Sequence, residues 1–138
     1  MGFYDTYKTV FINAKSSLEK VTELNNVVSG EKYRISKLPM AVIDPGVTPI
    51  KKGSIGGKLL LGLRFQVYVI VTATEPEDWM KDIVKPMGAV VDQILTDKTL
   101  SGAVLDVFPR GFVPRTLPLK GKVYYGGVIE FEATLFYS

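Results

Sequence analysis

The sequence contains no cysteine and no histidine. Without cysteine, the chain can form no disulfide and offers no thiolate to a metal or a substrate. Without histidine, it lacks the side chain most often used for proton transfer near neutral pH and the commonest transition-metal ligand. Serine–histidine triads and zinc–histidine sites are therefore excluded, which leaves carboxylate, lysine, serine and tyrosine chemistry. We expect a protein that is not an enzyme and that holds no metal and no cofactor.

Long apolar runs are also missing. The longest, residues 59–73, is interrupted by Gly62, Arg64 and Gln66, whereas a membrane helix needs roughly 18 or more apolar residues. The first residues lack the basic and then apolar regions of a secretory signal, so we expect synthesis in the cytoplasm. A length of 138 residues with 46% apolar content favours a single compact domain over residues 1–138.

Charge is distributed unevenly, although the net charge is only +3. Residues 75–97 contain six acidic residues and two lysines, whereas residues 107–129 contain four basic residues and no acidic one. Such asymmetry suits either nucleic-acid contact or head-to-tail association of identical subunits.

Two segments have the apolar spacing of amphipathic helices. In residues 5–29, apolar side chains recur at steps of three and four, and Ser29-Gly30 can end the helix because glycine tolerates the left-handed conformation. Residues 79–94 show the same spacing. Pro86 falls inside this second pattern and cannot donate a backbone hydrogen bond, so we expect a kink or a break near Lys85. A capping box formed by Thr74 and Glu77 is expected just before it.

Four segments are predicted to be strands: residues 35–43, 58–74, 103–108 and 122–137. The second and fourth alternate apolar and polar residues with a period of two, as half-buried strands do. In the last strand one apolar set is expected to face a single side, namely Ile129, Phe131, Ala133 and Leu135.

Two segments rich in proline and glycine are predicted to be loops. Asp44-Pro45-Gly46 forms a turn and opens residues 44–58, an exposed arm that is either a loop or a loosely paired hairpin. Residues 109–121 form a basic loop punctuated by prolines. The predicted fold is α+β, with two main helices packed on one face of a mostly antiparallel sheet.

Candidate chemical motifs are weak. The glycine-rich residues 53–58 end in a lysine, but that lysine leads into a strand and not into the helix that a phosphate-binding loop requires. Glu130 and Glu132 share one face of a strand at about 7 Å, which suits either acid–base work or, as we favour, a solvated sheet face. The basic loop contains Phe112 and is followed by Tyr124 and Tyr125, so it could bind single-stranded nucleic acid by stacking and phosphate attraction.

The order of elements resembles the tail terminator and head–tail neck proteins of tailed viruses. In these families a helix ends in an aspartate-x-threonine-leucine-glycine-like turn before a strand with two spaced valines. The matching positions here are Asp97, Thr99, Leu100, Gly102, Val104 and Val107. In this turn we expect the aspartate to turn the chain, the leucine to enter the core and the glycine to allow a tight entry into the strand.

The resemblance implies a virion structural protein that assembles in the host cytoplasm. It implies a homo-oligomeric ring, expected to be a hexamer, that caps the tail tube, joins it to the head connector and lets DNA pass through its lumen. A neck adaptor or tail tube protein of the same fold is the alternative, and a small nucleic-acid-binding module is the alternative of another class. A small-molecule enzyme or binding domain is the third hypothesis, against which the missing histidine and cysteine weigh.

A closed ring needs two different, complementary patches on each subunit. The candidate interface residues come from the acidic second helix and the basic loop: Glu77, Asp78, Asp82, Asp92, Arg110 and Arg115. The candidates for contact with the lumen or the tube are the lysines of the arm and of the basic loop: Lys51, Lys52, Lys58, Lys120 and Lys122.

Overall fold

The computed structural model describes residues 2–29, 35, 37–53, 57–72, 75–119 and 121–137. The helical elements are α1 (Phe3–Leu18), the 3-10 turn η1 (Pro76–Asp78), the π-helical turn η2 (Met80–Val84) and α2 (Lys85–Thr96). The strands are β1 (Asn26–Ser29), β2 (Met40–Pro45), β3 (Ile50–Lys52), β4 (Leu59–Val71), β5 (Asp106–Leu119) and β6 (Lys122–Tyr137). The predicted α+β fold is confirmed.

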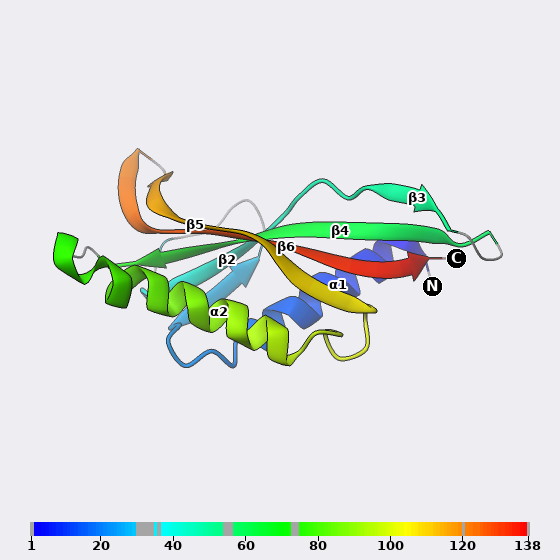
Figure 1. The fold of residues 1–138 in the computed structure, drawn as a ribbon, viewed down its shortest axis with the longest axis horizontal. Helices are drawn as coiled ribbons and strands as arrows, with labels where there is room; N and C mark the ends of the chain where they lie inside the picture. Colours follow the sequence, from blue (N-terminus) through cyan, green and yellow to red (C-terminus); the bar gives the residue numbers. More distant parts are fainter. Residues whose placement is uncertain are drawn as a thin grey trace.

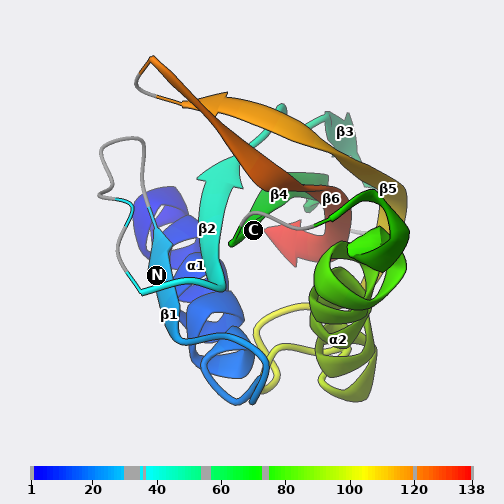
Figure 2. The same ribbon diagram turned by 90° about the vertical axis from the view of Figure 1, so that its left-hand side faces the viewer.

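The strands form one mixed but mostly antiparallel sheet in the order β1-β2-β4-β6-β5, and β3 pairs with β4 beside this path. Only β1 and β2 run parallel among the pairs within the described residues. Both helices lie beneath the same face of the sheet, α1 below the β1–β2 side and α2 below the β5 side (Figure 1, Figure 2). We call the opposite face of the sheet the open face.

The core lies between this sheet and the two helices. Alternate residues of β4 and β6 turn toward the helices and are buried, as the period of two predicts. The predicted apolar set of β6, including Ile129 and Leu135, is buried as expected. At the centre, the Phe65 and Phe131 rings stack with centroids 5.3 Å apart.

The first helix is shorter than predicted. It ends at Leu18, and Asn26–Ser29 form strand β1 instead of the last helical turns. The backbone N–H of Asn25 donates to the Pro39 carbonyl at 2.7 Å, and its side-chain Nδ2 donates to the Leu38 carbonyl at 2.8 Å. These bonds hold the chain beside the start of β2, so that β1 and β2 pair.

The predicted turn at Asp44-Pro45-Gly46 is wrong, because β2 continues through Pro45. Asp44 and Pro45 pair with Gln66 and Phe65 of β4, and the Gly46 N–H donates to the Arg64 carbonyl at 2.8 Å. Farther along, β3 pairs with the first residues of β4. Of the two readings of residues 44–58, the paired hairpin arm is therefore confirmed, while residues 54–56 lie outside the described part.

The second helix changes type where the kink was expected. The π-helical turn η2 gives way to the α-helix α2 at Lys85, and Pro86 lies in the first turn of α2. A proline in a first turn breaks no helical hydrogen bond, because the first N–H groups of a helix have no partner within it. Of the expected capping box, Thr74 lies outside the described residues.

The turn after α2 has the features that its sequence predicts. The Ser101 N–H donates to the Asp97 Oδ1 at 3.1 Å, and the Leu100 side chain is fully buried. Leu100, Ser101 and Gly102 all have positive φ, of 47°, 58° and 87°. Asn13 of α1 donates from Nδ2 to the Leu100 carbonyl at 2.8 Å and so ties this turn to the first helix.

The predicted basic loop is wrong, because residues 106–119 form strand β5. This strand also begins three residues later than the predicted strand over residues 103–108. β5 lies at the edge of the sheet, with β6 as its neighbour in the strand order. A proline in an edge strand can turn its nitrogen outward, where no hydrogen bond of the ladder is lost. Pro114 and Pro118 are four residues apart and so face the same way, and a bulge between Pro109 and Gly111 shifts the pairing.

The β5–β6 hairpin coils across the open face. Gly126 has a φ of +152°, and a Cβ there would overlap the carbonyl oxygen of Val69. Beyond this point the hairpin crosses over the sheet toward β2 (Figure 2). Leu117 there joins Met40, Val42 and Ile70 in a second, smaller apolar cluster.

Candidate interaction surfaces

One flank of the molecule has an apolar groove along α1. The groove, of about 590 Å³, is lined by aromatic and aliphatic residues of α1 together with the ends of β1 and β2. Tyr4 and Ile12 are 71% and 51% exposed on this helix. Lys8, Lys15 and Glu19 also line it, so its charged residues have an excess of one positive charge. We call this surface the α1 groove.

The other flank carries apolar side chains along the edge strand. Phe108, Phe112 and Val113 of β5 are 38%, 40% and 51% exposed, and Leu105 just before the strand is also exposed. Because the alternation of a strand sends neighbours to opposite faces, Phe112 and Val113 project on both sides of this edge. We call these four residues the β5 flank.

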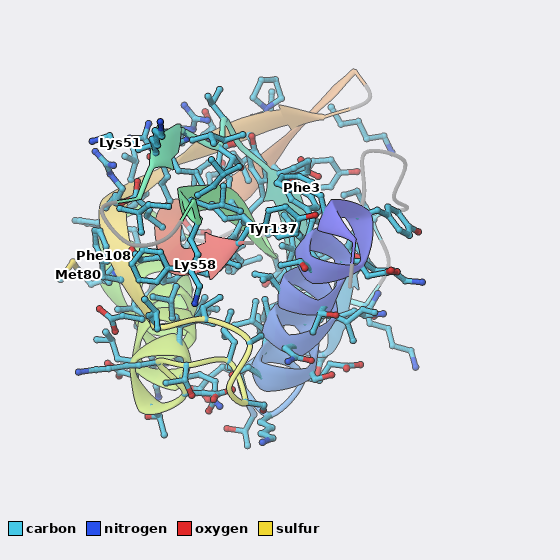
Figure 3. The ribbon with its side chains drawn as sticks, turned by 90° about the vertical axis from the view of Figure 1, so that its right-hand side faces the viewer. Phe3, Lys51, Lys58, Met80, Phe108 and Tyr137 are labelled. Atoms are coloured by element: carbon cyan, nitrogen blue, oxygen red, sulfur yellow. The ribbon has the colours of Figure 1, made fainter. Side chains whose placement is uncertain are left out.

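The two surfaces lie on opposite sides of the subunit. The strand order places β1 and β5 at the two ends of the sheet, and α1 contacts β1 and β2 whereas α2 contacts β5 and β6. Figure 3 shows Phe108 projecting on the side of α2 and β5, away from α1. Exposed apolar patches of this kind on a small domain mark interaction sites.

The predicted interface residues lie on the helical segment from η1 to α2 and on β5. Because α2 and β5 pack directly together, the acidic helix and the basic strand are neighbours within the subunit. Arg110 and Arg115 are exposed on β5, Glu77 and Asp78 are exposed on η1, and Asp82 is half-buried. The exposed Asp92 turns toward residues 20–23 after α1, with which it lines a cavity. If the interface is head-to-tail, both segments face the same neighbour, and their complement has to lie on the α1 side.

The predicted lumen or tube lysines are separated. Lys51 and Lys52 on β3 and Lys58 near the β3–β4 turn lie at one end of the long axis, where Figure 3 shows Lys58 projecting close to Tyr137. Lys122 lies in the β5–β6 turn region at the opposite end (Figure 1). Lys120 lies outside the described residues. The two hairpins extend in opposite directions, so one surface cannot take both sets.

A charged cluster connects three strands on the open face. The Glu132 Oε1 accepts hydrogen bonds from Arg64 Nε at 2.9 Å and from Arg110 Nη1 at 2.7 Å. Burial of the Glu132 carboxyl raises its pKa, but the hydrogen bonds and charges of the two arginines outweigh this effect and hold the pKa below its usual range. Glu132 therefore stays ionised and accepts hydrogen bonds, while Glu130 lies toward Gln66 in a separate pocket.

Sequence reasoning missed both arginine contacts and the α1 groove. Arg64 and Arg110 lie 68 and 22 positions from Glu132, so only the strand register brings them together. The groove residues follow the helical spacing, and Tyr4, Lys8, Ile12 and Lys15 at steps of four and three could have indicated a second, partly apolar stripe.

Within the described residues, no group of three or more acidic, cysteine or histidine side chains could hold a metal ion. In the same part of the chain, no helix is long and apolar enough to cross a membrane. No protein-family model and no curated protein sequence matches this chain.

Proposed function

We propose that this chain is a virion structural protein of the tail terminator type, which forms a ring that caps the tail tube and joins it to the head connector. The observation that carries the proposal is the pair of unlike apolar surfaces on opposite flanks, the α1 groove and the β5 flank. Each copy in a head-to-tail contact uses one surface of each kind, and such contacts close into a ring when the rotation between neighbours allows it.

The chemistry of the edge strand supports a contact made by side chains. An open strand edge could also recruit another strand through backbone hydrogen bonds. Pro114 and Pro118 of β5 offer no N–H to a neighbour, so this edge is poorly suited to strand addition. The exposed side chains of Phe108, Phe112 and Val113 are then the natural contact, and the α1 groove is an apolar surface that can receive them.

Charge also supports this arrangement. Lys8 and Lys15 line the α1 groove together with Glu19, and α2, the helix that carries the acidic residues, packs against β5. Docking the β5 flank of one copy on the α1 groove of the next brings the acidic helix toward these lysines, which favours the correct partner more than it raises the affinity. We assign the β3–β4 arm to contact with the tube and Lys122 at the other end to the lumen.

The proposal is tested by two substitutions that each remove one surface. Ile12→Asp places a charge in the α1 groove, and Phe112→Asp places one on the β5 flank. Each variant alone should lose self-association, because a buried unpaired charge at a contact weakens it by about a hundredfold or more. An equimolar mixture should form a 1:1 dimer and nothing larger, since one intact groove and one intact flank remain to meet.

Light scattering after size-exclusion chromatography measures the masses. Val123→Asp is the matched control, because Val123 is also exposed but lies in β6 beside the hairpin turn, away from both surfaces; it should associate like the natural chain. A mixture that stays monomeric would overturn the head-to-tail contact. A monomer that instead shifts short DNA in a salt-dependent way would favour the nucleic-acid-binding alternative.

A further inference from the structure

A small pocket on the open face has an excess of positive charge. It has a volume of about 210 Å³, and its charged lining residues are Lys51 of β3, Arg64 of β4, Arg110 of β5 and Glu132 of β6. Three cations therefore face one carboxylate. Thr134 adds a hydroxyl to the lining. We call this site the three-cation pocket.

The two guanidinium groups are held in place before any ligand arrives. Both donate to one oxygen of Glu132, whose side chain is only 17% exposed. Each guanidinium has five N–H donors in a fixed fork, so one bond to Glu132 leaves others for a ligand. A ligand meeting such oriented donors loses less conformational entropy than one that has to order two long side chains.

The backbone is also adapted to this cluster. A Cβ at Gly62 would lie 3.3 Å from the Glu132 carboxyl carbon, so the glycine leaves the space that the carboxylate occupies. The bulge between Pro109 and Gly111 places Arg110 on the open face, where it reaches Glu132. Bulges commonly redirect a side chain in this way.

We propose that the three-cation pocket binds a tetrahedral oxyanion, either inorganic phosphate or the phosphate group of a monoester. The excess of two positive charges among the lining residues matches a dianion. Several oxygens on one centre can accept from both arginine forks and the lysine together, which a carboxylate with two oxygens does less well. The volume is ample, since a water molecule in the liquid takes up about 30 Å³.

The test is calorimetric titration of the full chain with inorganic phosphate at constant ionic strength, set with sodium chloride. Lys51→Ala and Arg110→Ala should each weaken phosphate binding by about tenfold, the loss expected for one charge-assisted contact. Two matched controls lie close by. Lys52→Ala changes the next residue of β3, which alternation turns to the other face, and Arg115→Ala changes another exposed arginine of β5. Both controls should bind phosphate within about twofold of the natural chain.

Thermal unfolding of each variant checks that it is folded, and all four positions are exposed. Titration with a nucleoside monophosphate tests whether the pocket binds a phosphate monoester, and titration with acetate tests whether it binds a carboxylate. The proposal predicts binding of phosphate or of the monophosphate, with acetate at least about tenfold weaker because it is singly charged. Acetate binding as tightly as phosphate, equal losses in the Lys51 and Lys52 variants, or no heat with either phosphate compound would overturn it.

Discussion

Replacing Gly126 with alanine should destabilise the protein by an amount that follows from two features of the structure. The φ of +152° lies in a region that alanine rarely adopts, which costs about 2 kcal/mol. The added Cβ would also overlap the Val69 carbonyl oxygen. That oxygen belongs to β4, which pairs with β6 along its whole length, so it cannot move without disturbing the ladder, at a further cost of about 2 kcal/mol. We expect a loss of about 4 kcal/mol in the free energy of unfolding.

Two other glycines calibrate the measurement. Gly121 has a φ of +75° but open space around its Cα, so Gly121→Ala should lose only the backbone contribution, about 1 kcal/mol. Gly88 lies within α2 with open space where the methyl group of an alanine would lie, so Gly88→Ala should gain about 0.5–1 kcal/mol. Urea unfolding followed by circular dichroism measures all three. If Gly126→Ala loses no more than Gly121→Ala, the close approach of β6 to β4 at this residue is refuted.

Three further predictions concern the charged and polar contacts. Because the pKa of Glu132 is lowered in the folded chain, its contribution to stability is present above the ordinary pKa of 4.5 and is lost as the pH falls through the lowered value. In Glu132→Gln, the free energy of unfolding should therefore fall less steeply as the pH is lowered. An unchanged dependence of the free energy of unfolding on pH would contradict this prediction. Asp92→Lys should lower the oligomer mass at low salt and have less effect at high salt, because screening weakens contacts between exposed charges. An unchanged oligomer mass by light scattering at low salt would show that Asp92 does not contribute to the contact between copies. Asn13→Ala should cost about 1 kcal/mol in thermal unfolding, because it removes the 2.8 Å hydrogen bond to the Leu100 carbonyl and leaves only the longer bond from the Ala103 N–H at 3.3 Å. A loss below about 0.3 kcal/mol would show that water replaces the bond.

The strands with strict alternation were predictable from sequence. β6 spans Lys122–Tyr137 as expected, because apolar and polar residues alternate between Ile129 and Leu135 and the apolar set is buried against the helices. The irregularity near Lys85 was predictable for a similar reason, since the missing N–H of Pro86 is a local property of the chain, and the structure shows it as a change from a π-helical turn to an α-helix.

The end of the first helix was not predictable from periodicity. Val21 is buried, as the helical pattern requires, but a turn holds it. In strand β1 the buried residue is Val27, while Val28, which the helical pattern places in the core, is half-buried. The strand after the first helix depends on the hydrogen bonds from Asn25 to the carbonyls of residues 38 and 39, which helical periodicity does not reveal. Helical spacing therefore identified the buried residues up to Val21 and was wrong where the chain becomes a strand.

The basic segment shows the same limit. Three prolines between residues 109 and 118 argue for a loop in isolation, yet an edge strand tolerates them. The strand order of the whole sheet makes β5 an edge strand. The register between β5 and β6 sets where the bulge lies and so brings Arg110 to Glu132. The three-cation pocket could not be predicted from the sequence because its residues come from four strands.

The most direct measurement is the molar mass of the natural chain in solution, determined by light scattering over a wide range of concentration. The account predicts one discrete assembly at a multiple of the 15.2 kDa subunit mass, with closed rings visible by electron microscopy. A particle that remains at the subunit mass at the highest concentration reached would contradict it.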